Sequence, residues 1–285
     1  MRIGVTLPQF GGQAADGAEE VAAFARAAEE RGADGLWVGD RLLAPVEPTV
    51  GYGGGPGFPP QFRRQLDPLT LLGVAAAATS RARLGTNVLN APWYPPPLLA
   101  RTALTLDRIS GGRFLLGLGT GWSPEEFDAV GVPMAERGIR LDECLKVLRA
   151  WWDDDPVAHD GPVSRIAPAH VDLKPHGVPV YLAGVAPRAR RRVVEHADGW
   201  LPVAVPGRTD LRTAVLEPWA GLRERAGREL GAVLRVNPLP GTPVREVTDL
   251  LAEAADAGIE EAFVELMYLA DSADAALDLV EGLVG

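Results

Sequence analysis

The chain has 285 residues, of which 47% are hydrophobic and 23% charged, a composition typical of globular, water-soluble proteins. Its net charge of −10 argues against a nucleic-acid partner, which would favour a basic face. We find no run of about 18 uncharged apolar residues, and so expect no membrane span. The N-terminus lacks the layout of a signal peptide. A single cysteine, Cys144, excludes an internal disulfide and fits the reducing cytoplasm, where we expect the protein.

The first predicted elements are a strand over residues 3–7 and a helix over residues 18–31. Apolar residues recur in that helix at the i, i+3, i+4 and i+7 spacing of a single face. A second strand is predicted at residues 34–38. Residues 41–65 are rich in Gly and Pro and show no period, so we expect a long loop there. Loops of this length in compact domains are usually functional or mobile.

Asp67-Pro68 has the pattern of a helix start, an N-cap followed by Pro at the first helical position. The third strand, residues 84–90, runs into a polar, Pro-rich loop and a helix that ends at Gly111-Gly112. The fourth strand covers residues 114–118. Residues 153–177 are irregular, with short strands expected near 164–166 and 171–173. Later strands are predicted at residues 178–182, 199–203, 233–236 and 262–266.

Counting along the chain gives about eight strands, each followed by a helix, which implies a parallel sheet with right-handed crossovers. Eight such units in a chain of this length indicate a single α/β (β/α)8 TIM barrel with loop insertions at the C-terminal rim. An open, doubly wound sheet is the alternative. No linker-like segment divides the chain, so we expect one domain over residues 1–285.

Several common catalytic motifs are missing from the sequence, among them HExxH, a P-loop lysine, G-x-S-x-G and CxxC. None of the four histidines is paired at metal-ligand spacing, so no metal is expected. Cys144 lies in the apolar stripe of a helix, which indicates a core residue. The glycines at 117, 119 and 121 are too closely spaced for a dinucleotide-binding fingerprint, but a glycine turn lets backbone approach a ligand.

Acidic residues stand at two predicted loop starts. Asp40 closes the second strand, where a carboxylate would point into a site at the barrel rim, unless it simply pairs with Arg41. Residues 123–126 read as a capping box, which would explain Glu126 as the capping residue and leave Glu125 free to face a substrate.

Aromatic residues and a helix start complete the candidate site. Trp93 and Trp122 flank the same loops and could line a pocket for a planar ring, although a packing role is equally consistent. Residues 180–187 run from a strand through small residues into a helix, whose first N–H groups could hold a phosphate. An ordinary strand-to-helix turn is the alternative there.

Six short segments carry a family resemblance. They are Ile3-Gly4-Val5-Thr6-Leu7-Pro8-Gln9, Leu36-Trp37-Val38-Gly39-Asp40, Leu84-Gly85-Thr86-Asn87-Val88, Leu106-Asp107-Arg108-Ile109-Ser110-Gly111-Gly112-Arg113, Gly117-Leu118-Gly119-Thr120-Gly121-Trp122 and Pro179-Val180-Tyr181-Leu182-Ala183-Gly184. In this order, over residues 1–200, they resemble the bacterial luciferase-like superfamily of flavin and deazaflavin enzymes, most of all its coenzyme F420-dependent branch. The last third of the chain matches only as a generic barrel.

The resemblance implies a cofactor at the C-terminal rim of the barrel. In the family, a non-prolyl cis peptide ends the third strand behind the deazaflavin ring, which here would be Asn87–Val88. The resemblance thus implies that Thr86, Asn87 and Val88 bind the cofactor. Asp40 matches a carboxylate near the polar edge of the ring. The side chain and phosphate of the cofactor would lie along two loops, whose matching residues are Thr120, Gly121, Ala183, Gly184 and Val185.

Some positions depart from the family pattern. Pro96 stands where many relatives carry a His before the helix that follows the third strand. Trp122 and Glu125 stand where relatives that oxidise sugar phosphates carry Glu and Asn. These departures argue against a sugar-phosphate substrate.

The resemblance thus implies an F420-dependent oxidoreductase that moves a hydride between the deazaflavin and a small organic substrate. Asp40 would position the ring and Glu125 would donate or accept a substrate proton. Trp93, Tyr94 and Trp122 would shape the substrate pocket. An FMN-dependent monooxygenase on the same barrel is the alternative, and a flavin- or deazaflavin-binding barrel without turnover is the alternative from another class. Homodimers are common in the family, so one is expected here by analogy.

Overall fold

Parallel strands form the centre of the molecule in this computed structural model, which describes residues 1–55 and 57–285. Most of them are buried on both faces, as expected for a parallel sheet covered by helices. The strands, in chain order, are β1 (Arg2–Thr6), β2 (Gly35–Val38), β3 (Arg83–Thr86), β4 (Leu89–Asn90), β5 (Phe114–Gly119), β8 (Val180–Ala183), β9 (Gly199–Leu201), β10 (Val203–Ala204), β11 (Gly231–Val236) and β12 (Glu261–Val264).

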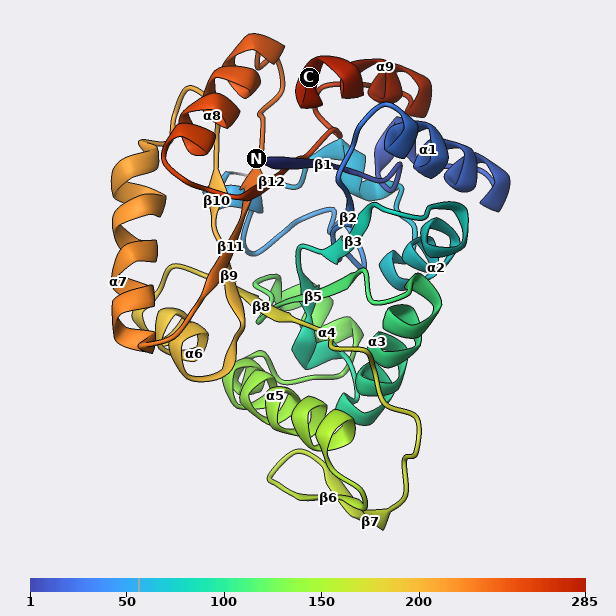
Figure 1. Cartoon of the computed structure of the whole chain (residues 1–285), viewed down its shortest axis with the longest axis vertical. Helices are drawn as coiled ribbons and strands as arrows, with labels where there is room; N and C mark the ends of the chain where they lie inside the picture. The colour runs from blue at the N-terminus through green and yellow to red at the C-terminus, as the bar shows by residue number, and fades with distance from the viewer. Residues whose placement is uncertain (56) are drawn as a thin grey trace.

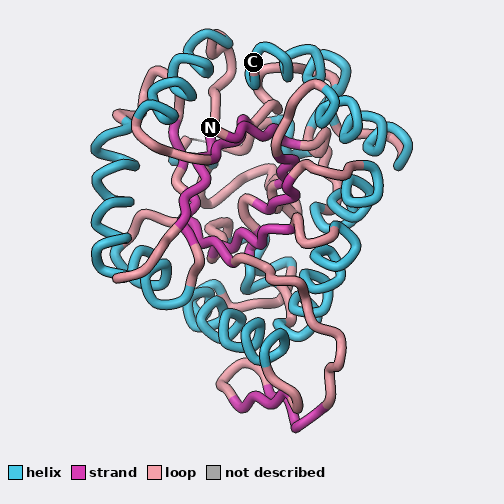
Figure 2. Tube along the Cα trace, viewed as in Figure 1, coloured by secondary structure: helices cyan, strands magenta, loops and turns pink. Residues whose placement is uncertain are grey.

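The sheet closes on itself. Neighbouring strands of the ring pair in parallel. β4 continues the line of β3 along β5, and β9 and β10 both pair with β11, which completes the ring. Figure 2 shows this ring of strands enclosed by helices. The (β/α)8 barrel predicted from the sequence is therefore confirmed, and the open, doubly wound alternative is excluded.

Helices surround the barrel and bury its outer face (Figure 1). Asp67 caps α2 through a hydrogen bond of 2.7 Å from the amide of Thr70, as the Asp-Pro pattern predicts. A π-helical turn (Arg212–Leu216) precedes α7, and short 3₁₀ turns occur at Gly11–Gln13, Tyr52–Gly54, Pro60–Arg63, Ala91–Trp93 and Met134–Glu136. The α-helices are α1 (Ala18–Glu30), α2 (Pro68–Ala78), α3 (Pro96–Ser110), α4 (Pro124–Ala129), α5 (Arg137–Asp153), α6 (Pro187–His196), α7 (Glu217–Ala226), α8 (Val244–Asp256) and α9 (Ala273–Val284).

Large side chains fill the inside of the barrel. Trp37 and Phe263 stack there, with ring centroids 4.5 Å apart and planes inclined by 11°. Leu115, Leu201 and Val233 pack around this pair and are fully buried. A second, larger apolar layer, which includes Cys144, lies between the strands and the helices. The interior is thus packed, so ligands can reach the barrel only at its ends.

The third strand is interrupted where it approaches the rim. The hydroxyl of Thr86 donates to the carbonyl of Gly117 and accepts from the amide of the same residue, both at 2.8 Å. The peptide bond after Asn87, Asn87–Val88, is cis, which confirms the expectation from the family resemblance. The backbone then returns to the sheet as β4, so Asn87 and Val88 form a bulge at the strand end.

The segment after α5 carries a small hairpin away from the barrel (Figure 1). Strands β6 (Val157–Asp160) and β7 (Arg165–Ala169) pair antiparallel, so the strand expected near residues 164–166 is present. The strand expected at 171–173 is not formed. There the amide of Val171 binds the carboxylate of Asp155, which replaces a sheet partner.

The long loop predicted over residues 41–65 crosses the C-terminal rim. Its described part contains two 3₁₀ turns, Tyr52–Gly54 and Pro60–Arg63, and an isolated antiparallel bridge from Gln65 to Phe10, and Pro56 lies outside the described residues. No described helix of the chain combines the length and apolarity that crossing a membrane would require.

The Thr86 hydroxyl should contribute to stability. Thr86→Val keeps the shape of the side chain but leaves the buried amide and carbonyl of Gly117 without this partner, so we expect a loss of about 1–3 kcal/mol in the free energy of unfolding. Urea denaturation would measure it. Thr105→Val is the matched control, because Thr105 is exposed on α3 and bonds only the carbonyl of Arg101. Equal losses in both variants would contradict the assignment.

Candidate functional site

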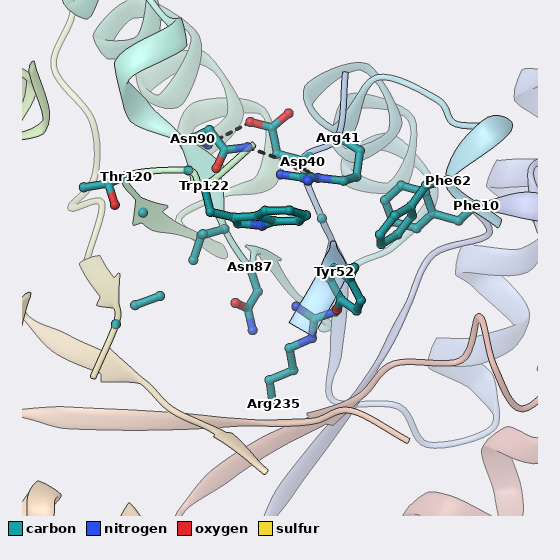
Figure 3. Close-up of a pocket in the computed structure, with 16 residues that line it drawn as sticks. Phe10, Asp40, Arg41, Tyr52, Phe62, Asn87, Asn90, Thr120, Trp122 and Arg235 are labelled. Carbon is teal, nitrogen blue, oxygen red and sulfur yellow. Dashed lines mark hydrogen bonds between the residues drawn. The ribbon is translucent and has the colours of Figure 1, made fainter. Parts of the chain in front are cut away.

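A pocket opens at the C-terminal rim of the barrel, on the side of the loops that follow β2, β3, β5 and β8 (Figure 3). This is the end of a parallel barrel where active sites are found. The residues that line it are Phe10, Gly39, Asp40, Arg41, Tyr52, Phe62, Asn87, Val88, Asn90, Gly119, Thr120, Gly121, Trp122, Ala183, Gly184 and Arg235.

One wall of the pocket consists of small residues and backbone. It is formed by the bulge at Asn87–Val88 together with the ends of β5 and β8. A Cβ added to Gly119 would lie 2.7 Å from a methyl group of Val88, so only glycine fits there. Gly121 has φ +72°, a conformation that other residues rarely adopt. The wall therefore gives a ligand direct access to the backbone.

Asp40 stands at one end of this wall and is buried. Its Oδ2 accepts hydrogen bonds from the amide of Asn90 at 2.8 Å and from the hydroxyl of Tyr94 at 3.2 Å. Burial raises the pKa of Asp40 to about 6, because the hydrogen bonds only partly replace the lost water. Among the described residues, no hydrogen bond reaches Oδ1. The Asp40 carboxyl can therefore hold or release a proton near neutral pH.

Arg41 begins the long loop and makes a buried ion pair. Its Nη1 lies 2.9 Å from Oε2 of Glu126, and both side chains are at least 93% buried. The other oxygen of Glu126 accepts hydrogen bonds from the amides of Leu42 and Leu43. The carboxylate of Asp40 does not pair with Arg41, which was the alternative considered from the sequence. The Nε of Arg41 donates instead to the backbone carbonyl of Asp40, at 2.9 Å.

The capping box predicted at residues 123–126 is wrong. Ser123 makes no capping hydrogen bond, and Glu126 turns away from it to hold the loop that follows β2. Glu125 carries a structural role instead of being free. It accepts hydrogen bonds from the amide of Thr49 at 2.6 Å and from the Ser123 hydroxyl at 3.0 Å. The Thr49 bonds lower its pKa to about 2, and it does not line the pocket.

Aromatic rings surround the guanidinium of Arg41. Trp122 is nearest, with its ring centroid 4.8 Å from the Arg41 Cζ, and it lines the pocket (Figure 3). Trp93 lies one layer further out, 6.0 Å from Arg41 and edge-on to Phe127. Tyr94 also stands behind the pocket, where it supports Asp40. Of the three predicted pocket residues, only Trp122 reaches the surface of the cavity.

Of the other predicted cofactor residues, most line the pocket and two do not. Thr120, Gly121, Ala183 and Gly184 line the pocket, as do Asn87 and Val88. Thr86 is buried behind the bulge, where both its hydrogen bonds go to Gly117. Val185 is two-thirds exposed on the loop that leads to α6 and does not line the pocket.

Sequence reasoning missed the aromatic side of the pocket and the charge of Arg235. Tyr52 and Phe62 come from the long loop, whose lack of period gives no indication of where its side chains point. Phe10 packs edge-on against Phe62 at 5.3 Å. Arg235 was detectable as a lone charge within an otherwise apolar strand. It pairs with Glu265 of β12's end at 3.0 Å.

The Arg41–Glu126 pair should be important for stability. Glu126→Gln removes the charge that compensates the buried Arg41, so we expect the free energy of unfolding to fall by about 3 kcal/mol or more. The neighbouring Glu125→Gln changes a more exposed carboxylate and should cost about 1 kcal/mol or less. Chemical denaturation of both variants would test this, and a larger loss in Glu125→Gln would contradict it.

The raised pKa of Asp40 predicts a pH dependence. Its folded-state value of about 6 lies above the reference value of 3.8, so the native state binds this proton more tightly than the unfolded state. The stabilisation that comes from this tighter proton binding is fully present below pH 3.8. It is lost as the pH rises through about 6. Relative to Asp40→Asn, the wild type should therefore lose up to about 3 kcal/mol over this window, as measured by urea unfolding at several pH values. Identical pH slopes in both proteins would contradict the prediction.

Comparisons with known proteins agree with this architecture. The family model described as luciferase-like monooxygenase matches residues 1–273. An uncharacterised protein of Mycobacterium tuberculosis is 33% identical over 273 residues, which cover 92% of each chain.

Two solved structures share the fold. One is the monooxygenase RslO1 from Streptomyces bottropensis, with a TM-score of 0.66 and 23% identity over 98% of this chain and 82% of that chain. The other is an F420-dependent secondary alcohol dehydrogenase in complex with an F420–acetone adduct, with a TM-score of 0.74 and 17% identity over 99% of this chain and 98% of that chain. With a family model that matches nearly its whole length, the chain belongs to the luciferase-like monooxygenase family.

Proposed function

We propose that the protein is an F420-dependent oxidoreductase that transfers a hydride between the deazaflavin and a small organic substrate. The observation that carries this proposal is the wall of small residues beside a buried carboxyl. Gly119 and Gly121 leave backbone open on one side of the pocket, and Asp40 stands at its end. A flat, fused ring with polar atoms along one edge has the complementary shape and chemistry.

Other features of the wall fit the same ligand. The Nδ2 of Asn87 is buried and has no hydrogen-bond partner among the described residues. Such a group costs free energy unless a ligand satisfies it. The amide can donate to a ring carbonyl, and the free Oδ1 of Asp40 can accept from a ring N–H. Both polar ends of a deazaflavin would then find a partner.

The loop after β8 suits the other end of the cofactor. Ala183 and Gly184 line the pocket, and the chain then enters α6, whose first N–H groups have no partner within the helix. The start of a helix favours negative charge, so a phosphate of the cofactor tail fits there. In this arrangement the ring and the tail follow the rim from β3 to β8.

The residues of the chain would bind and orient, because the bound deazaflavin itself supplies the hydride chemistry. Asp40 would fix the edge of the ring and hold a proton near neutral pH. Trp122 and the aromatic residues of the long loop would shape the substrate side. Glu125 lies outside the pocket and binds the amide of Thr49. Its position therefore does not support the proton-transfer role that the sequence suggested.

Titration of the purified protein with F420 and with FMN, followed by fluorescence quenching under identical conditions, tests the proposal. We expect tighter binding of F420. Preference for FMN would favour a monooxygenase instead, and binding of neither would contradict both.

The same titration tests the role of Asp40. Asp40→Ala should weaken F420 binding about tenfold, the size of one hydrogen bond to a charged group, without unfolding the protein. Asp278→Ala, on the exposed face of α9, is the control and should bind as the wild type does. Equal F420 affinity in Asp40→Ala and the wild type would exclude this role.

A further inference from the structure

Asp40 is held by the short segment that begins at the end of β4. The backbone amide of Asn90 donates to Oδ2 of Asp40 at 2.8 Å, and the hydroxyl of Tyr94 donates to the same oxygen at 3.2 Å. The side-chain amide of Asn90 also donates to the backbone carbonyl of Asp40, at 3.1 Å (Figure 3). Hydrogen bonds from Asn90 and Tyr94 thus fix both the backbone and the carboxyl group of Asp40.

The backbone around Tyr94 leaves its hydroxyl little freedom. Tyr94 lies between the 3₁₀ turn Ala91–Trp93 and three consecutive prolines at positions 95–97. A residue before proline is confined to extended backbone, and Tyr94 has φ −100° and ψ 132°. Burial and the charges of Asp40 and Asp67 raise the pKa of Tyr94, so its hydroxyl keeps its proton and remains a donor.

The two oxygens of the Asp40 carboxyl therefore differ in what they can do. Oδ2 accepts two hydrogen bonds, and the hydrogen of the Asn90 amide cannot turn away from it because the backbone fixes that hydrogen. A proton on Oδ2 would meet this hydrogen, so a proton on Oδ1 is favoured. Within the described chain no hydrogen bond reaches Oδ1, and Asp40 lines the pocket. The proton is thus held on the oxygen that is left for a ligand.

Other groups act on the same carboxyl. Burial raises the pKa of Asp40, and the hydrogen bonds from Asn90 and Tyr94 oppose this rise. The positive charge of Arg41 also opposes it, whereas the negative charge of Glu126 adds to it. Arg41 and Glu126 form a buried pair, and the Asn90 donor belongs to the backbone. Of these groups, Tyr94 is the one whose contact can be removed without changing a charge or the backbone.

We propose that Tyr94 is a positioning residue for Asp40, whose hydroxyl reserves Oδ2 for a hydrogen bond within the protein and leaves Oδ1 to exchange a proton and to bind the cofactor. The part that concerns the cofactor rests on the proposed function. On ionisation, the O–H bond at Oδ1 breaks and the proton passes to water. Oδ1 then accepts a hydrogen bond from a ring N–H, which the acid form, with a proton on that oxygen, faces as a donor. By stabilising the ionised form, Tyr94 lowers the pH at which Asp40 can make this bond.

Removal of the Tyr94 hydroxyl should move the titration of Asp40. Tyr94→Phe takes one donor away from the carboxylate, so the midpoint should rise by about one pH unit, the roughly tenfold effect of a hydrogen bond to a charged group. The midpoint is measured on the free protein by carbon-13 NMR of the aspartate carboxyl groups, in which the signal missing from Asp40→Asn identifies Asp40. A variant damaged only in its packing would lose stability without this rise.

Tyr181→Phe is the matched control. Tyr181 is also a partly buried tyrosine of the barrel, but its ring lies beside Gly199 and Gly231, at the opposite end of the strands, and it should leave the midpoint of Asp40 unchanged. If Tyr94→Phe fails to fold, 3-fluorotyrosine introduced at position 94 replaces it. This more acidic phenol donates more strongly, so the midpoint should then fall.

The pH dependence of F420 binding gives a second readout. The wild type and Tyr94→Phe are each compared with their Asp40→Asn counterparts at the same pH, which cancels any titration of F420 itself. Near pH 6.5, Tyr94→Phe should bind F420 about two- to threefold more weakly than the wild type, because a smaller fraction of Asp40 is ionised. At about pH 8.5 Asp40 is ionised in both proteins, and the difference should disappear.

An unchanged or lower midpoint in Tyr94→Phe would overturn the inference, as would an equal rise in Tyr181→Phe or an unchanged midpoint with 3-fluorotyrosine. A loss of F420 affinity that is the same at both pH values would overturn the part that concerns the cofactor. If F420 does not bind the wild type, the proposed function fails, and the NMR midpoint, which needs no cofactor, decides the role of Tyr94 separately.

Discussion

The buried ion pair between Arg41 and Glu126 determines how the rim of this barrel is built. Glu126 comes from α4, after the fourth barrel strand, whereas Arg41 and the amides that share its carboxylate come from the loop after the second. A single carboxylate therefore fixes the first turn of a loop of more than twenty residues. Because that loop also carries Tyr52 and Phe62, the aromatic side of the pocket depends on this contact.

The two sides of the pocket differ in origin as well as in chemistry. The small-residue wall is made by strand ends, whose positions are fixed by sheet hydrogen bonds and by the two hydrogen bonds of the Thr86 hydroxyl to Gly117. The aromatic side is made by a loop held by side-chain contacts. A rigid surface of the first kind suits a ligand that must be held in one orientation, and a surface of the second kind can adapt to different substrates.

The barrel could be predicted because short stretches of sequence indicate its elements: each strand is a short apolar run, and each helix has a periodic apolar face. The bulge at Asn87–Val88 followed from resemblance. The roles of Glu125 and Glu126 were predicted wrongly because a capping box is a local pattern, whereas the backbone partners of Glu126 lie 83 and 84 positions away in the chain. Arg235 was overlooked although it is the lone charge of an apolar strand, because the sequence does not show that Glu265, after the neighbouring strand, pairs with it.

The stacked pair Trp37 and Phe263 has a consequence for the kinetics of the protein. Together with its neighbours it fills the barrel interior, so a ligand can enter the pocket only from the C-terminal rim. Two ligands that share one mouth cannot exchange independently when one lies above the other. Under the proposed function, the ligand seated against the strand ends would enter first and leave last, so the packing itself would impose an ordered sequence of binding and release.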